Sequence, residues 1–148
     1  MMKKYRNSLL FLFSIISIHT SAQLGFQKLY GGHNQESGVQ SALGYFCIYT
    51  LGSTTSSGAG SSDIALWNVD LSGNVIWAKT FGGTYEDEAS YIVGADDGGL
   101  AVAGFSSSFN INQNKDLLLF KTNSYGNIVW QKVFAAPSNG TCNFNPDF

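Results

Sequence analysis

Residues Asp63–Gly83 read DIALWNVDLSGNVIWAKTFGG, and a related stretch, DLLLFKTNSYGNIVWQKVF, occupies Asp116–Phe134. The two stretches align in order at a spacing of 53 residues. The recurring positions are Asp63 and Asp116, Trp67 and Phe120, Gly73 and Gly126, and Trp77 and Trp130. Each stretch therefore predicts an apolar strand, a Gly-Asn turn and a second strand that carries a Trp. Self-similarity at a fixed period indicates a repeat architecture.

A shorter segment recurs three times, at Phe26–Gly32, Trp77–Gly83 and Trp130–Phe134. Each copy has an aromatic residue, a Lys two positions later and another aromatic two positions after that. Gly82 and Gly83 end the middle copy, and Gly52 and Gly104 recur 52 residues apart after apolar runs. Spacings that drift between 51 and 53 place the insertions in loops, where insertions are tolerated.

Each unit divides into four short runs rich in β-branched and aromatic residues, which predict strands. Gly-Asn and Asp-Asp-Gly-Gly segments separate several of them and have turn chemistry. No segment after residue 22 has a sustained helical period. The predicted strands are 39–43, 45–51, 64–69 and 75–81 in the first unit, and 90–93, 100–105, 117–122 and 128–134 in the second.

The third and fourth strands of a unit differ in pattern. Ile64–Trp67 and Leu117–Phe120 are continuously apolar, which is typical of strands buried on both faces. The fourth strand is mixed, with Trp77, Lys79 and Phe81 on one face. We expect it at a sheet edge, where a Lys discourages pairing with other strands.

The predicted fold is all-β, with two four-stranded antiparallel propeller-like blades and an extra outer strand at 24–30. The repeats span about 33–83 and 84–134, and residues 135–148 form an irregular tail. A Greek-key sandwich is the alternative, since eight or nine short strands would also fill one. We prefer blades because a sandwich gives no reason for a period of 53 residues.

Residues 1–22 have the layout of a signal peptide: basic residues at Lys3, Lys4 and Arg6, the apolar run Leu9–Ile18, and small residues before Gln23. A retained signal anchor is the alternative, although the run is shorter than a membrane span needs. We expect export, no membrane span after cleavage, and a secreted or cell-surface location. The remaining chain is acidic and has no basic cluster, which argues against nucleic-acid binding.

The pattern W-x-K-x-F-G-G, then D-G-G at Asp97–Gly99, Gly104, Asp116 and G-N-x-x-W at Gly126–Trp130 resembles the propeller-type repeats of exported Bacteroidota proteins. The resemblance covers Phe26–Phe134 and implies a closed ring of blades. Those proteins often end in a type IX secretion sorting domain, which has no counterpart here. Two blades fall short of a ring, so the chain is a fragment, a protein whose blades assemble between chains, or an open two-blade stack.

Little in the sequence indicates an enzyme, a cofactor or a metal site. After cleavage His33 is the sole histidine, and no G-x-S-x-G, H-E-x-x-H or P-loop motif occurs. The acidic residues 86–88 and 96–97 lack the spacing of a calcium loop, so we read them as solvated loops, with a bound cation as the alternative. Cys47 and Cys142 could form a disulfide after export, or lie unpaired.

Asp63 and Asp116 precede the apolar third strands, where we expect them to bond backbone donors at a corner; a ligand contact is the alternative. The aromatic content raises the possibility of stacking on sugars, whereas the repeated Trp positions favour packing between blades.

The sequence therefore predicts a non-enzymatic exported scaffold or interaction module at the cell surface, with an unknown protein or glycan partner. The alternative is a lectin with two blades per chain, assembled as an oligomeric propeller. A homo-oligomer could close a ring.

Overall fold

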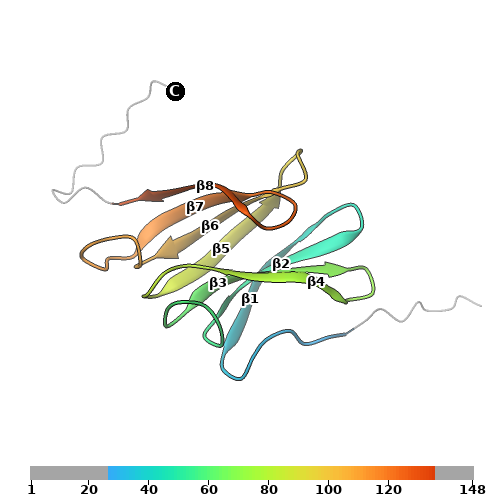
Figure 1. Cartoon of the computed structure of the whole chain (residues 1–148), viewed down its shortest axis with the longest axis horizontal. Helices are drawn as coiled ribbons and strands as arrows, with labels where there is room; N and C mark the ends of the chain where they lie inside the picture. The colour runs from blue at the N-terminus through green and yellow to red at the C-terminus, as the bar shows by residue number, and fades with distance from the viewer. Residues whose placement is uncertain (1–26, 136–148) are drawn as a thin grey trace, which may run out of the picture.

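A computed structural model describes residues 27–135, which form eight strands and no helix. The strands make two four-stranded antiparallel sheets, each with its strands in chain order. Sheet I contains β1 (Glu36–Leu43), β2 (Cys47–Thr54), β3 (Asp63–Asp70) and β4 (Val75–Phe81). Sheet II contains β5 (Asp87–Gly94), β6 (Leu100–Ser106), β7 (Asp116–Thr122) and β8 (Ile128–Phe134). Figure 1 shows sheet II above sheet I. The all-β prediction is confirmed.

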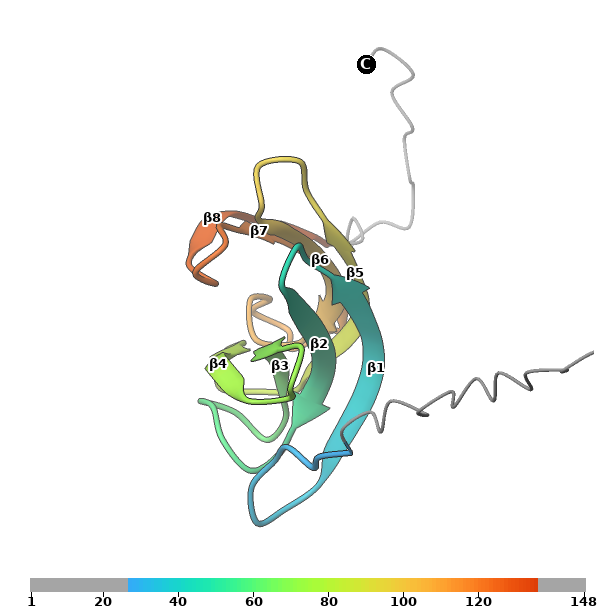
Figure 2. The same ribbon diagram turned by 90° about the vertical axis from the view of Figure 1, so that its right-hand side faces the viewer.

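The repeat extends to irregularities of the strand pairing. The β1–β2 register shifts between Gly38 and Gln40, and the β5–β6 register shifts between Ala89 and Tyr91. The β3–β4 and β7–β8 pairs each shift once more, near the turn that joins them. Bulges bend a strand and increase its twist, so each sheet curves in the same way. Figure 2 shows the curved sheets from the side.

The turns within the sheets also repeat. In Asp70–Asn74 the N–H of Asp70 donates to the carbonyl of Asn74, and the N–H of Gly73 donates to the carbonyl of Asp70. Asn123–Asn127 has the same two bonds, as does 95–99 between β5 and β6. The fourth residue of each turn is a glycine with φ between 72° and 77°, a region that disfavours side chains.

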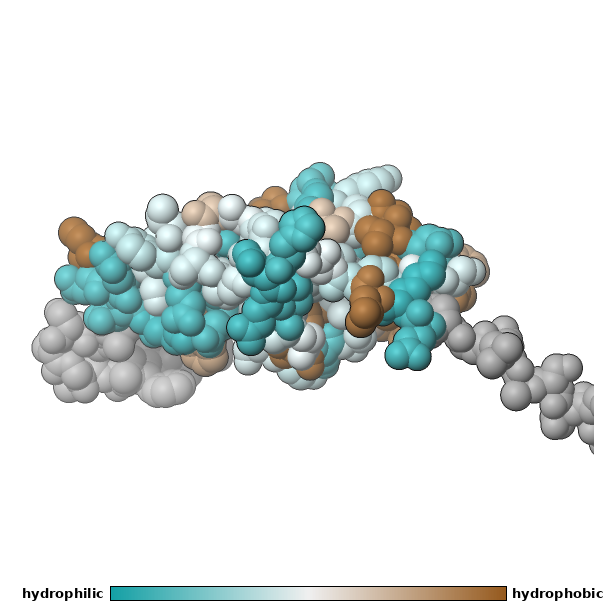
Figure 3. Space-filling view, turned by 90° about the horizontal axis from the view of Figure 1, so that it is seen from below, coloured by the Kyte–Doolittle hydropathy of each residue, from teal (hydrophilic) through white to brown (hydrophobic). Residues whose placement is uncertain are grey.

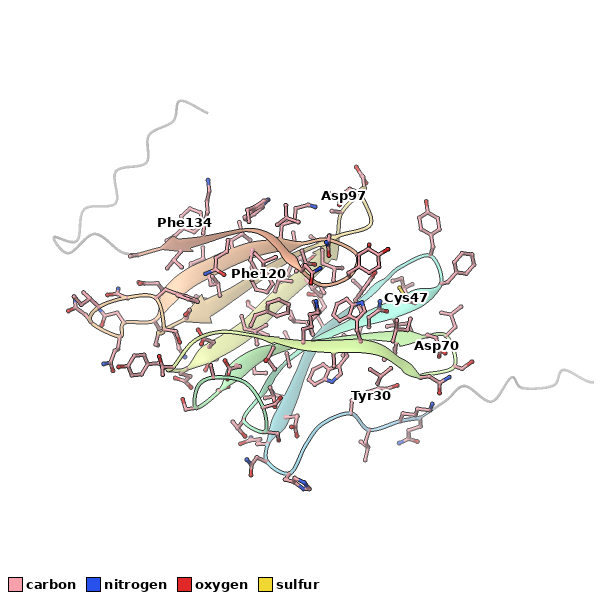
Figure 4. The ribbon with its side chains drawn as sticks, in the orientation of Figure 1. Tyr30, Cys47, Asp70, Asp97, Phe120 and Phe134 are labelled. Atoms are coloured by element: carbon pink, nitrogen blue, oxygen red, sulfur yellow. The ribbon has the colours of Figure 1, made fainter. Side chains whose placement is uncertain are left out.

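The two sheets stack on each other around one apolar core. Phe81 of β4 lies against Phe120 of β7, with ring centroids 4.8 Å apart, and Figure 4 shows Phe120 between the sheets. The core cluster consists of Tyr49, Leu51, Ile64, Leu66 and Phe81 from sheet I, and Ile92, Leu100, Val102, Leu118 and Phe120 from sheet II.

All eight predicted strands occur, with different bounds in two hairpins. β1 and β5 begin three residues before the predicted starts, because Glu36 and Asp87 pair with Thr54 and Ser106. The second strand runs over Cys47–Thr54 rather than 45–51, since residues 44–46 form the hairpin turn. The strand order excludes a Greek key over residues 27–135, because every neighbouring pair is consecutive in the chain.

The extra outer strand is not confirmed. Residues 27–30 belong to no strand, and residues 24–26 lie outside the described part. The predicted signal peptide and the tail from residue 136 onward, with Cys142, lie outside it as well. Within residues 27–135, no helix has the length and apolarity of a membrane span.

The two third strands differ in burial. β3 is covered on both faces, as predicted. The same prediction is wrong for β7, whose burial alternates and whose Leu117 is 42% exposed. Sheet I covers one face of β7, and no described element covers the other.

Candidate interaction surface

The packing of the two sheets uses different faces of two equivalent units. Ile64 of β3 points at sheet II, since a Cβ placed on Gly104 would lie 2.8 Å from its Cδ1 atom. The residues of β7 in the same core cluster are Leu118 and Phe120. The counterparts of these two residues in sheet I are Ala65 and Trp67, one position away from Ile64 and Leu66. Neighbouring residues in a strand point to opposite faces. The sheets therefore pack front to back.

The front face of a sheet is defined here by the set Ile64, Leu66, Trp77, Lys79 and Phe81 in sheet I. Its counterparts in sheet II are Leu117, Leu119, Trp130, Lys132 and Phe134. Ile64 and Leu66 are fully buried and Phe81 is 9% exposed, whereas Trp130 and Phe134 are 39% and 51% exposed. Ile64 and Phe81 are thus buried, whereas their counterparts Leu117 and Phe134 are exposed; Leu66 is buried and its counterpart Leu119 half-buried. We call the second set the open front face.

The open front face is hollowed. A depression of about 320 Å³ is lined by Leu119, Trp130, Lys132 and Phe134. Figure 4 shows Phe134 on β8 at the far side of sheet II from sheet I. Three apolar or aromatic side chains and one Lys therefore line one depression, which is suited to binding another apolar face.

Polar contacts between units also recur. The Nζ atom of Lys79 donates to Oδ1 of Asn127 at 2.6 Å. Lys28 makes the same contact with Asn74 at 2.7 Å. Trp77 covers the next turn, since a Cβ on Gly126 would lie 2.8–3.1 Å from its ring atoms. The first turn is met by Tyr30, whose hydroxyl donates to the carbonyl of Gly73 at 2.7 Å.

Residues 27–30 therefore meet sheet I as β4 meets sheet II, although they form no strand. Figure 1 shows this segment (blue) below sheet I, on the side away from sheet II. We call the surface of sheet I that receives it the back face, with Ala65, Trp67 and Val69 as its β3 residues. Ala65 and Val69 are each 2% exposed.

A repeated polar corner begins each sheet. Oε1 of Glu36 accepts the N–H of Gly32, and Oδ2 of Asp87 accepts the N–H of Gly83. Hydroxyl groups of Ser56 and of Ser108 complete the two corners. The bond from Ser56, followed by that from Gly32, lowers the pKa of Glu36.

The prediction of a solvated loop is wrong for residues 86–88, because Asp87 and Glu88 begin β5 and Asp87 is fully buried. Lysines pair with the exposed acidic side chains. Lys115 lies 2.9 Å from Glu88 and 3.7 Å from Glu86, and Lys121 pairs with Asp97. The hydrogen bond from Lys121 is the main cause of the lowered pKa of Asp97. Among the described residues, no group of three or more His, Cys, Asp or Glu side chains could hold a metal ion.

The predicted repeat positions fall at strand starts, turns and packing faces. Asp63 begins β3 and accepts the N–H of Gly60, whereas Asp116 begins β7 and accepts the side-chain amide of Asn110. Gly82 lies where a Cβ would collide with both Asp63 and Asp87. A Cβ on Gly83 would lie 2.7 Å from that of Ser108, and one on Gly52 would meet the backbone of Ser37.

A second concave region lies at one end of the two sheets. A groove of about 960 Å³ runs between the β1–β2 and β5–β6 turns, with Asp96 and Ser124 among its polar lining residues. Tyr45 and Phe46 at its rim are 99% and 82% exposed. Burial, followed by the hydrogen bond with Cys47, raises the pKa of Tyr49 in this groove to about 12. In Figure 3, exposed apolar residues (brown) gather toward the same end of the molecule.

Sequence analysis missed the contacts between units. The recurrence of Lys28 with Lys79, and of Asn74 with Asn127, is visible in the sequence. Their pairing across separations of 46 and 48 residues is not. Comparison with protein-family models and with curated proteins found no match.

Proposed function

We propose that this chain is an exported, non-enzymatic β-propeller-repeat protein that acts as a scaffold or interaction module at the cell surface. The observation that carries the proposal is the open front face: Leu117 and Phe134 are exposed, although their counterparts Ile64 and Phe81 are buried between the sheets. Large contiguous apolar patches are uncommon on soluble monomers, and such patches mark sites of protein association. Front-to-back stacking of four-stranded meanders is also how propeller blades follow one another.

Export and surface display are tested by locating the chain in its native cells. The expected result is a protein outside the cytoplasm whose N-terminus is Gln23, as signal-peptide cleavage requires. External protease should remove it from intact cells. A chain that keeps Met1 and is protected from the protease would contradict the proposal.

The second candidate function is carbohydrate binding, and the groove beside Tyr45 and Phe46 favours it. Aromatic faces stack on sugar rings, and Asp96 could accept hydroxyl bonds. The groove lies between the turns of both units, so one chain would carry one such site. Glycan-array binding that is lost in Tyr45→Ala and kept in Tyr125→Ala, at an exposed tyrosine of another turn, would support a lectin. Absence of binding to any glycan would exclude it.

A further inference from the structure

The chain contains one complete example of how its units bind each other. In that example the front face of sheet I covers Leu118 and Phe120 of sheet II. Phe81 stacks near Phe120, Trp77 covers Gly126, and Lys79 bonds Asn127. This interface has a buried apolar centre and an exposed Lys79–Asn127 bond, so it shows which surface a front face of this composition fits.

Both halves of a second such interface are present at the two ends of the molecule. The open front face repeats the aromatic-Lys-aromatic order in Trp130, Lys132 and Phe134. The back face of sheet I is equivalent to the face of sheet II that packs on sheet I. Its turn Asp70–Asn74 has the same backbone bonds as Asn123–Asn127. Within one chain the open front face of sheet II cannot reach the back face of sheet I. The two sheets are stacked, so these two surfaces lie on opposite sides of the molecule.

The back face of sheet I is occupied by residues 27–30 of the same chain. Lys28 bonds Asn74 as Lys79 bonds Asn127 one unit later, and Tyr30 bonds the carbonyl of Gly73, whose counterpart Gly126 is covered by Trp77. This attachment consists of one exposed bond from Lys28 and one part-buried bond from Tyr30, and Leu29 between them is 99% exposed. An arriving strand with the same side-chain order could replace it.

We propose that the open front face binds the back face of sheet I in a second copy of this chain, and that β8 of one copy displaces residues 27–30 of the other. This inference rests on the proposed interaction function and names its partner. Lys132 then donates to Asn74 of the second copy, as Lys79 donates to Asn127. Phe134 packs on the back face of that copy, as Phe81 packs on sheet II. The contact is head to tail, so it closes into a ring if the rotation between copies permits, and otherwise extends.

The first test is light scattering with size exclusion on the chain beginning at Gln23, over a range of concentrations. Wild type should self-associate, and Lys28→Ala with Tyr30→Phe should tighten self-association about tenfold, because two competing bonds are removed. Phe134→Arg should be monomeric. Ile111→Arg, at a 95% exposed residue of the 107–115 loop, should behave as wild type.

A mixing experiment with two complementary variants tests the head-to-tail geometry. Phe134→Arg disables the open front face, and Asn74→Arg places a positive charge where Lys132 must bind. Each variant alone should be monomeric, whereas their mixture should contain one-to-one pairs, since each supplies the half that the other lacks. Retained circular dichroism would show that both variants fold.

Two results would overturn the inference: no association in the mixture, or self-association of Phe134→Arg equal to that of wild type. The wild type and the Lys28→Ala, Tyr30→Phe variant both remaining monomeric would do the same. These outcomes concern the purified chain and leave surface display untouched. A cytoplasmic chain that still forms the pairs would instead contradict the proposed function and keep the interface.

Discussion

At the scale of single residues, two equivalent turns of the chain begin with different side chains, Asp70 in one and Asn123 in the other. Oδ1 of Asp70 accepts the N–H groups of Ser72 and Asn74, and Oδ1 of Asn123 accepts those of Tyr125 and Asn127. An amide oxygen and a carboxylate oxygen thus perform the same task. Only the carboxylate titrates, and the bonds from Asn74 are the main cause of its lowered pKa.

This difference predicts that the pH dependence of the unfolding free energy can be removed from one turn by Asp70→Asn and introduced into the other by Asn123→Asp. A lowered folded pKa stabilises the fold above the ordinary value of 3.8, and the stabilisation is lost as the pH falls through the folded pKa. The free energy of unfolding of Asp70→Asn should therefore fall less steeply below pH 3.8 than that of wild type. Asn123→Asp should fall more steeply. Urea unfolding at several pH values measures both, and equal slopes in all three proteins would contradict the assignment.

Two glycines with similar backbones separate strain from packing. Gly98 and Gly126 both have positive φ, but the nearest atom to a Cβ on Gly98 lies 4.0 Å away, whereas Trp77 crowds Gly126. Gly98→Ala should cost about 1 kcal/mol in unfolding free energy from backbone strain. Gly126→Ala should cost about 3 kcal/mol, because the methyl group also displaces Trp77. Thermal unfolding measures both, and equal costs would show that Trp77 does not cover Gly126.

At the scale of elements, β3 and β7 have the same pattern and different surroundings. Leu66 is fully buried, and its counterpart Leu119 lies half-buried on the open front face. Leu66→Ala should destabilise the chain by about 3 kcal/mol. Leu119→Ala should cost about 1 kcal/mol in the monomer, since less apolar area is lost. Denaturant unfolding at low protein concentration measures the difference, and equal costs would mean that something covers β7.

The same pair of strands shows what the sequence could predict. Continuous apolar runs and repeated turns predicted eight strands, because these signals are local. Their order was inferred from the period of 53 residues, which favoured blades over a Greek key. The exposure of Leu117 was not predictable, since it depends on which other element packs on that face of β7. The sequence also did not predict which face of sheet I packs on which face of sheet II, because a period of 53 residues carries no information about the packing faces. For the same reason the open front face could not be found, although each of its residues was visible.

At the scale of the whole molecule, the sheets share one core and should unfold together. β5 contacts β1, β2 and β3 as well as its own sheet. Gln40 of β1 accepts the N–H of Ile92, and Ser53 of β2 accepts that of Ala89. Coupling between neighbouring repeats makes an array cooperative. Circular dichroism and Trp fluorescence should therefore report one coincident transition, whereas two separate transitions would mean that the sheets are independent.

The central claim, front-to-back packing of equivalent units, is tested most directly by the proton chemical shift of Gly126. Its Cα faces the ring of Trp77, so ring current should move one Hα resonance strongly upfield and give cross-peaks to the indole protons. Trp77→Leu should return the resonance to its ordinary position, whereas Trp130→Leu, at the same place in the other unit, should leave it unchanged. An ordinary shift in the wild type, or a shift relieved by Trp130→Leu alone, would contradict the account.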